Sequence, residues 1–243
     1  MNIAIVGAAG RMGQMLCKLV KDAGHTPEPI DVAEGFAKEW SADCKGVIDF
    51  SYHTAVPGHI QTAAQQKLPY VIGTTGLIAE EQAVVDAAAK VIPVVQSGNY
   101  SLGVNLLLGL VEKAASVLGS EYDIEITEIH HKHKKDAPSG TALMLANAAA
   151  KGRDADTPVR EFLFGRKGDI GERPQGEIAI HALRGGSVVG DHTVMFMGDV
   201  ERIELTHKAQ SREAFAAGAI KALLWAISQP AGAYTMKSVL GFE

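Results

Sequence analysis

Short apolar strands alternate with amphipathic helices along the first hundred residues. In the first helical segment, which Gly24 ends, apolar residues recur at offsets of 0, 3, 4, 7 and 8 from Met12. Strands are predicted at residues 2–6, 46–50, 70–72 and 91–95, and further helices at residues 57–66 and 79–90. This alternation predicts a doubly wound parallel sheet, in which ligands bind at the carboxyl ends of the strands.

The pattern changes after Ser101. A long apolar helix is predicted at residues 102–118, and residues 122–129 alternate polar and apolar side chains, as in a strand with one wet face. Similar strands are predicted at residues 177–183, 187–197 and 200–207, with hairpin-like connections at 184–186 and 198–199. A final helix at residues 212–228 is expected to return to the first domain. The sequence thus predicts an α/β protein with a Rossmann-like domain, residues 1–100 completed by about 209–243, and a second α+β domain, residues 101–208, with a mixed or antiparallel sheet.

A glycine-rich turn joins the first strand to the first helix. Its glycines follow the spacing G-x-x-G-x-x-G, and the order strand, glycine turn, helix is the context of a dinucleotide-binding fingerprint. A turn with a purely structural role is the alternative, because Ala9 stands where the commoner fingerprint has its second glycine. The candidate cofactor contacts in this turn are Gly7, Ala8, Ala9, Gly10, Arg11 and Met12.

Asp31 lies 24 residues after Gly7, near the position at which an acid binds the ribose 2′-hydroxyl of a dinucleotide. Residues 32–34 contain no arginine for a 2′-phosphate, so the sequence favours NADH over NADPH, with NADPH possible if Lys38 substitutes. The ends of later strands supply further candidate cofactor contacts, although each could equally be an ordinary turn. These contacts are Gly73, Thr74, Thr75, Ser97, Gly98, Asn99 and Tyr100.

Residues 128–142 gather three histidines, three lysines and two acids directly before a predicted helix. Histidine titrates near neutral pH, so such a cluster suits proton transfer to a negatively charged molecule. Pro138 disfavours helix before it and Ser139 is a good N-cap, so the helix is predicted to begin at Gly140. Because helix N-termini attract anions, Ser139, Gly140 and Thr141 are predicted to bind a carboxylate. A solvated run of surface charge is the alternative.

Composition excludes several other classes of protein. With 47% hydrophobic and 21% charged residues among 243, the chain is typical of a soluble enzyme, and a net charge of −5 argues against nucleic-acid binding. No apolar run reaches the roughly 18–20 residues of a membrane span and no basic signal-peptide segment is present, so a cytoplasmic protein is expected. The two cysteines form neither a disulfide framework nor a metal spacing. A zinc site at His130, His131, His133 and Asp136 is disfavoured because adjacent strand residues point different ways.

Residues 128–142 also resemble the signature of the dihydrodipicolinate reductase (4-hydroxy-tetrahydrodipicolinate reductase) family, E-x-H-H-x-x-K-x-D-x-P-S-G-T-A. The resemblance implies an NAD(P)H-dependent enzyme of lysine and diaminopimelate biosynthesis. Such an enzyme converts hydroxy-tetrahydrodipicolinate, a small dicarboxylate, to tetrahydrodipicolinate with loss of water, and typically forms a homotetramer through the sheet of its second domain. Further segments resemble family motifs in the expected order, at residues 7–13, 73–76, 99–101, 183–186 and 190–193.

The resemblance assigns roles within the signature. It implies that His130 donates a proton, that Lys134 is a second catalytic or substrate-polarising group, and that His131, Gly140 and Thr141 contact the substrate. It places the dinucleotide at Gly7 to Met12, Asp31, Gly73 to Thr75 and Ser97 to Tyr100.

Three positions depart from the family pattern. Ala9 replaces a frequent glycine, Gly98 replaces a frequent proline, and Val32 stands where an arginine often helps to bind NADPH. A non-catalytic NADH-binding sensor, or another imine or dicarboxylate reductase, is the alternative function.

Overall fold

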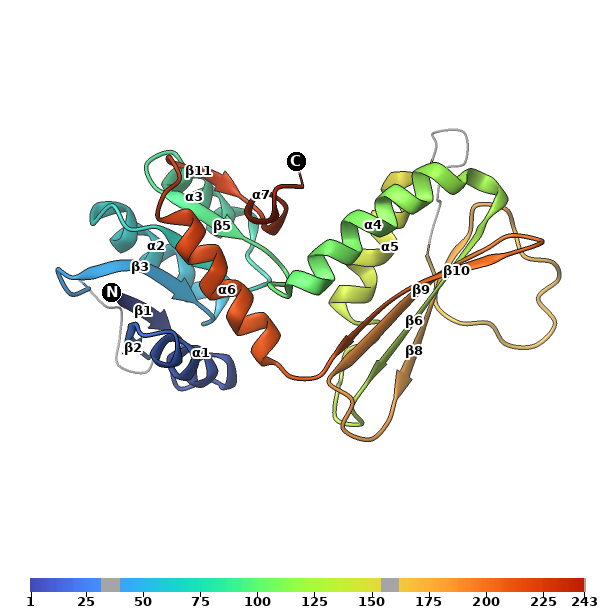
Figure 1. Cartoon of the computed structure of the whole chain (residues 1–243), viewed down its shortest axis with the longest axis horizontal. Coiled ribbons are helices and arrows are strands. Elements are labelled where there is room, and N and C mark those ends of the chain that lie inside the picture. Colours follow the sequence, from blue (N-terminus) through green and yellow to red (C-terminus); the bar gives the residue numbers. More distant parts are fainter. Residues whose placement is uncertain (32–39, 154–161, 243) are drawn as a thin grey trace. The chain divides into compact units, whose positions relative to one another are not determined.

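The computed structural model describes residues 1–31, 40–153 and 162–242 and divides into two compact units (Figure 1). Unit 1 comprises Met1–Leu102 and Arg212–Glu243, and unit 2 comprises Gly103–Ser211. The C-terminal segment therefore belongs to the same unit as the N-terminus.

Unit 1 is built on a six-stranded parallel sheet, as the alternating pattern predicts. Its last strand was not anticipated from the sequence, because only three residues extend the edge beside β5. The strand order is β11-β5-β4-β3-β1-β2. The strands are β1 (Asn2–Val6), β2 (Thr26–Ile30), β3 (Cys44–Asp49), β4 (Tyr70–Ile72), β5 (Pro93–Gln96) and β11 (Gly232–Tyr234).

Helices cover both faces of this sheet (Figure 1). Alternate residues of β1 enter opposite cores: Ile3 and Ile5 pack with one group of helices, whereas Ala4 and Val6 pack with the other. Burial on both faces explains why the strands are apolar almost throughout. The first core contains α1 (Arg11–Asp22), α6 (Glu213–Ala226) and the short α7 (Met236–Leu240), and the second contains α2 (Val56–Gln65), which follows the 3₁₀ turn η2 (His53–Ala55), and α3 (Ala79–Ala89).

Unit 2 packs two helices against a mixed five-stranded sheet. Its core joins apolar side chains of the helices to alternate residues of the strands, such as Ile124, Ile126 and Val194. The strand order is β10-β9-β6-β8-β7. The elements are α4 (Leu102–Leu118), the 3₁₀ turn η3 (Gly119–Glu121), β6 (Asp123–His130), α5 (Gly140–Gly152), β7 (Phe162–Leu163), β8 (Ile178–Arg184), β9 (Gly190–Met197) and β10 (Arg202–Ala209).

One of the two predicted hairpins is wrong. Strands β8 and β9 are not neighbours: β8 pairs in parallel with one edge of β6, and β9 pairs antiparallel with the other. The glycines at residues 185 and 186 are typical of a tight turn, but the central strand β6 separates the strands they connect. The parallel register sets His130 opposite Arg184. The second hairpin, between β9 and β10, is confirmed.

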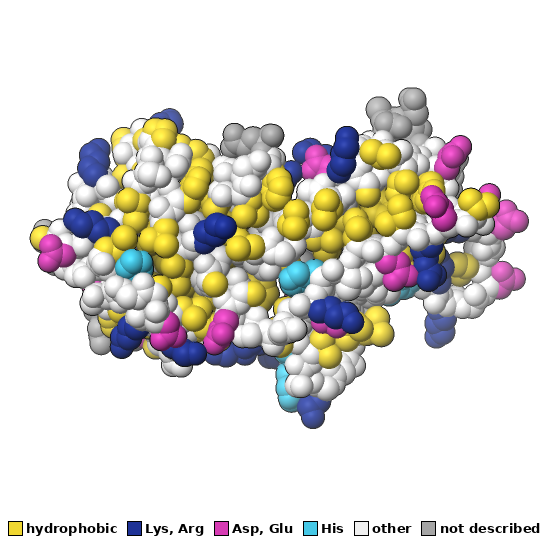
Figure 2. Space-filling view, in the orientation of Figure 1, with side chains coloured by type: hydrophobic (Ala, Val, Ile, Leu, Met, Phe, Trp, Pro, Cys, Tyr) yellow, Lys and Arg dark blue, Asp and Glu magenta, His cyan; other side chains and the backbone are white. Residues whose placement is uncertain are grey.

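The helix α4 is unusually apolar. Among the described residues, 102–121 form one helix that is long and apolar enough to cross a membrane by length and composition. Val104, Leu107 and Val111 pack in the core of unit 2, which accounts for one apolar face. On the same helix Leu106 and Leu110 are 44% and 47% exposed. Figure 2 shows hydrophobic side chains gathered on this face of unit 2.

Candidate active site

The glycine turn of unit 1 leaves no room for a side chain at two of its glycines. Gly7 has φ of +79°, and a Cβ there would lie 2.6 Å from the carbonyl oxygen of Phe50. A Cβ at Gly13 would collide with the Gly7 carbonyl oxygen, so only glycine lets α1 begin so close to the turn. Gly10 caps the helix without a side-chain hydrogen bond, and no acid stands in the first turn. This described helix start therefore fits an anion.

Asp31 follows directly on β2, beside the glycine turn. The backbone N–H groups of Gly7 and Ala8 donate to the carbonyl oxygen of Ile30, at 2.9 and 3.1 Å. The turn and the acid predicted to bind ribose are thus held next to each other. Residues 32–34 and Lys38, on which the NADH prediction also depends, lie outside the described residues.

A buried carboxylate at the end of β3 organises the neighbouring loops. Asp49 accepts hydrogen bonds from the hydroxyls of Ser51 at 2.6 Å, Tyr70 at 2.5 Å and Thr74 at 3.2 Å. Burial raises the pKa of Asp49, but hydrogen bonds from His59, Ser51 and Tyr70 together lower it below its ordinary value. An ionised group that no sequence motif marks therefore fixes the loop that contains Thr74, a predicted cofactor contact.

The second predicted loop, at residues 97–100, is fixed by its own hydrogen bonds. The Ser97 hydroxyl donates to the carbonyl oxygen of Asn99 at 2.7 Å. Tyr100 is buried in the core, and its hydroxyl lies 2.7 Å from the Ile72 oxygen and 3.0 Å from the Val95 oxygen. A cofactor would therefore meet the backbone of Tyr100 and not its ring.

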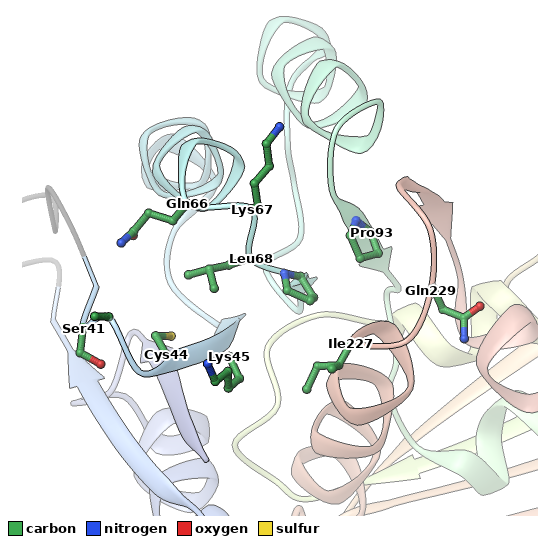
Figure 3. Close-up of a pocket in the computed structure, with 11 residues that line it drawn as sticks. Ser41, Cys44, Lys45, Gln66, Lys67, Leu68, Pro93, Ile227 and Gln229 are labelled. Carbon is green, nitrogen blue, oxygen red and sulfur yellow. The ribbon is translucent and has the colours of Figure 1, made fainter.

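A pocket of about 440 Å³ lies at the amino ends of the strands of this sheet (Figure 3). Its lining includes Cys44 and Lys45 at the start of β3, Pro93 at the start of β5, and Lys67 and Gln229. Because parallel sheets bind ligands at their carboxyl ends, this pocket is separate from the candidate cofactor site.

In unit 2, one buried carboxylate holds the predicted proton donor. Period-two alternation along β6 puts Glu128 and His130 on the same face of the strand. Oε2 of Glu128 lies 2.6 Å from His130 Nδ1 and 2.7 Å from Arg184 Nη1. Oε1 accepts from Arg184 Nη2 at 2.8 Å and from the Ser139 N–H at 3.0 Å. Four donors therefore converge on a fully buried side chain.

These contacts keep Glu128 ionised. Burial raises the pKa of the Glu128 carboxyl, but the hydrogen bonds from Arg184, His130 and Ser139 outweigh burial and bring the pKa below its ordinary value. The hydrogen bonds to Glu128 raise the pKa of Arg184. A carboxylate with a two-pronged guanidinium contact is a strong, directional pair.

A second histidine borders the first. His192 on β9 meets His130 edge to face, with ring centroids 5.2 Å apart, and its Nε2 lies 3.0 Å from the Ser139 hydroxyl. That hydroxyl also accepts from the Ala142 N–H, which confirms Ser139 as the N-cap of α5. Burial is the main cause that lowers the pKa of His192 to about 4, and the nearby His130 lowers it further. His192 is therefore neutral at pH 7.

Lys134 occupies the loop after β6. Its Nζ lies 2.8 and 2.9 Å from the two carboxylate oxygens of Asp136, and this hydrogen bond lowers the pKa of Asp136. The rings of His131 and His133 lie 6.2 Å apart. Within residues 1–31, 40–153 and 162–242, no three His, Cys, Asp or Glu side chains form a group that could hold a metal ion.

The structure thus brings His130 and the start of α5 together through residues that sequence reasoning left without a role. Glu128 could have been found from the alternation of β6, which places it beside His130. Arg184 and His192 lie in the segments at residues 183–186 and 190–193 that resemble family motifs. Their contacts with Glu128, His130 and Ser139 depend on the pairing of β8 and β9 with β6, which the sequence pattern does not predict.

Comparison with known proteins gives matches along nearly the whole chain. Residues 25–100 match the family model for the dihydrodipicolinate reductase N-terminus, and residues 103–240 match the model for its C-terminus. The 4-hydroxy-tetrahydrodipicolinate reductase of Methylocella silvestris is 46% identical over 265 aligned residues, covering 99% of this chain and 97% of the relative. The enzyme of the same name from Anaeromyxobacter dehalogenans is 45% identical, covering 100% and 98%.

Solved structures share the fold. A dipicolinate-bound dihydrodipicolinate reductase from Paenisporosarcina sp. TG-14 superposes with a TM-score of 0.74 at 22% identity, over 97% of both chains. A diaminopimelate (DAP) dehydrogenase from C. glutamicum gives 0.54 at 16% identity, covering 97% of this chain and 92% of the other.

Proposed function

The chain belongs to the dihydrodipicolinate reductase family and is an oxidoreductase of lysine and diaminopimelate biosynthesis, and we propose that His130 is the proton donor of its reaction. The reaction reduces 4-hydroxy-tetrahydrodipicolinate to tetrahydrodipicolinate and releases water. The observation that carries the proposal is the contact of His130 with a buried carboxylate beside the N-terminus of α5. A non-catalytic sensor would not need a histidine held in position for proton transfer.

The nicotinamide dinucleotide supplies a hydride when it is bound. Its pyrophosphate would meet the start of α1, and Asp31 would accept a hydrogen bond from the ribose 2′-hydroxyl, which favours NADH with NADPH as the second cofactor. Asp49 would hold the loop at Thr74 in place. The full set proposed to contact the cofactor is Gly7, Ala8, Ala9, Gly10, Arg11, Met12, Asp31, Gly73, Thr74, Thr75, Ser97, Gly98, Asn99 and Tyr100.

The substrate residues lie in unit 2. Loss of the 4-hydroxyl as water gives an unsaturated imine. Hydride addition to this imine leaves an electron pair that must be protonated, and His130 would supply the proton. The N–H groups at Gly140 and Thr141 and the positive end of α5 would bind a substrate carboxylate, with Ser139 holding the turn. Lys134, released from Asp136, would offset further negative charge, and His131 would contact the ring.

The assembly is proposed to be a homotetramer formed through the unit 2 sheet, in the cytoplasm. The face proposed to meet the other chains is the one opposite the core residue Val194. It contains Thr193 and Thr206, whose hydroxyls lie 3.0 Å apart. Analytical ultracentrifugation should give the mass of four chains of 25.7 kDa, and a monomer at micromolar concentration would rule out the tetramer.

A reductase assay with enzymatically generated 4-hydroxy-tetrahydrodipicolinate tests the function, with NADH and NADPH in parallel. We expect oxidation of both cofactors with higher kcat/KM for NADH. Absence of turnover with either cofactor would refute the function, and cofactor binding without turnover would favour the sensor. A strong preference for NADPH would refute the role of Asp31.

A further inference from the structure

We propose that Glu128 and Arg184 form a positioning pair that holds His130 with Nε2 as its proton-donating atom, and that Arg184 serves this pair and does not bind a substrate carboxylate. The proposal rests on the proposed function, in which His130 is the proton donor. It gives a role to an arginine beside a dicarboxylate site, where direct substrate binding would be the simplest expectation.

The hydrogen bonds at Glu128 determine which nitrogen of His130 is available. An ionised carboxylate has no hydrogen to donate, so in the 2.6 Å contact the Nδ1 atom of His130 must carry the proton. Only Nε2 can then give and regain a proton. A Cβ on Gly190 would lie 2.9 Å from Nε2, so the ring edge opposite Glu128 lies against a position that has no side chain.

All four Nη hydrogens of Arg184 already have acceptors. Nη1 and Nη2 donate to the two oxygens of Glu128 at 2.7 and 2.8 Å, and each also donates to a backbone oxygen, Nη1 to Leu183 at 2.6 Å and Nη2 to Asp136 at 2.8 Å. A substrate carboxylate could take one of these hydrogens only by displacing a partner. Moving Arg184 would leave Glu128 as a buried charge without its cation, which is strongly unfavourable.

The same carboxylate also fixes the proposed carboxylate-binding turn. The Ser139 N–H donates to Oε1 of Glu128, whereas His130 contacts Oε2. The proton donor and the start of α5 are therefore held by one group. Loss of that group should disturb proton transfer more than binding, because the N-cap bond from the Ala142 N–H to the Ser139 hydroxyl remains.

The groups around His130 set the sign of the expected pH effects. Glu128 faces it from β6, Arg184 lies opposite it on β8, His192 faces it from β9 with His207 beyond, and Lys134 and Asp136 belong to the following loop. Among these described groups only Glu128 places a negative charge in contact with the ring. The Glu128 charge stabilises an imidazolium, and the Arg184 charge opposes it.

The test compares Glu128→Gln, Arg184→Gln and the double variant. Glu128→Gln should lower kcat by roughly 10- to 100-fold, the effect of losing a residue that orients a functional histidine. KM for the dicarboxylate should change by less than about threefold. The high-pH limb of the kcat/KM profile should move to lower pH in Glu128→Gln and to higher pH in Arg184→Gln. The double variant should resemble Glu128→Gln alone, because the two residues act as a unit.

Glu125→Gln is the matched control. Glu125 lies on the same strand and accepts from Arg166 at 2.7 and 3.0 Å and from His181 at 2.6 Å, but it points to the opposite face of the sheet. It should lose stability and keep the parental pH limb. A shift of that limb equal to that of Glu128→Gln would overturn the proposal. If Arg184→Gln does not fold, Arg184→Lys is the substitute, because it keeps the charge without the two-pronged contact. Arg184→Lys should lower kcat and leave KM unchanged.

Three outcomes distinguish failure of this proposal from failure of the proposed function. If His130→Gln is inactive while Glu128→Gln keeps the parental kcat and pH profile, the positioning pair is refuted and the proton donor stands. A rise in KM alone in Arg184→Gln would identify Arg184 as a substrate-binding residue and also refute the pair. If His130→Gln is fully active, the proposed function fails first.

Discussion

Gly190 provides the space for the reactive edge of His130, and Gly190→Ala tests that geometry. The added Cβ would lie 2.9 Å from Nε2, roughly half an ångström inside the 3.4 Å at which ordinary contact begins. Because Glu128 holds the opposite edge of the ring at 2.6 Å, the ring must shift or tilt to make room. A misplacement of about 1 Å costs on the order of 10²-fold in rate, so half that shift predicts about a tenfold lower kcat.

Steady-state kinetics at saturating cofactor would measure this effect, with urea unfolding to measure the overpacking cost of about 1–3 kcal/mol. Gly185→Ala is the matched control, since a Cβ there meets nothing within 4 Å and the Gly185 N–H still donates to the His130 oxygen. The control should retain the parental kcat. If Gly190→Ala also retains it, Nε2 does not lie where the structure places it.

Three further predictions concern the buried polar groups. Asp49→Asn should lower the free energy of unfolding by about 1–3 kcal/mol at pH 7, because it breaks contacts with Tyr70 and Thr74, and NADH should bind more weakly. Since the folded pKa of Asp49 is lowered, the difference in free energy of unfolding between the parent and this variant should decrease below pH 4. A difference that stays constant with pH in urea titrations would contradict this prediction. The folded pKa of His192 is about 4, below its unfolded value. Neutral His192 therefore adds to the free energy of unfolding above about pH 6.5, and this contribution is lost as pH falls toward 4. In urea unfolding, His192→Gln should make the free energy of unfolding depend less on pH across this range. Ser139→Ala should cost about 1 kcal/mol as a lost N-cap, and an unchanged urea midpoint would show that the cap is dispensable.

Local patterns predicted most of the fold. Apolar runs identified the strands of unit 1 because a parallel sheet is buried on both faces, as Ile3 and Ala4 show by entering opposite cores. The course of residues 184–186 could not be predicted, since the turn chemistry is the same whether β9 pairs with β8 or with β6. That choice depends on contacts far apart in sequence.

The candidate site was predictable where chemistry lies in one segment. His130 and Ser139 belong to the same short run of sequence, and Ser139 caps α5 as its residue type predicts. Arg184 and His192 reach the same place only through the pairing of three strands. The role of Asp49 could not be predicted for a different reason. A single acid at a strand end forms no sequence motif, and its role depends on the hydroxyls that surround it.

The role of His130 is tested most directly by the turnover of His130→Gln with 4-hydroxy-tetrahydrodipicolinate and NADH, measured together with cofactor affinity. We expect a kcat lower by roughly 10²-fold or more, the effect of losing a general acid, while NADH binds as tightly as to the parent. A parental kcat in a folded His130→Gln enzyme would contradict this role.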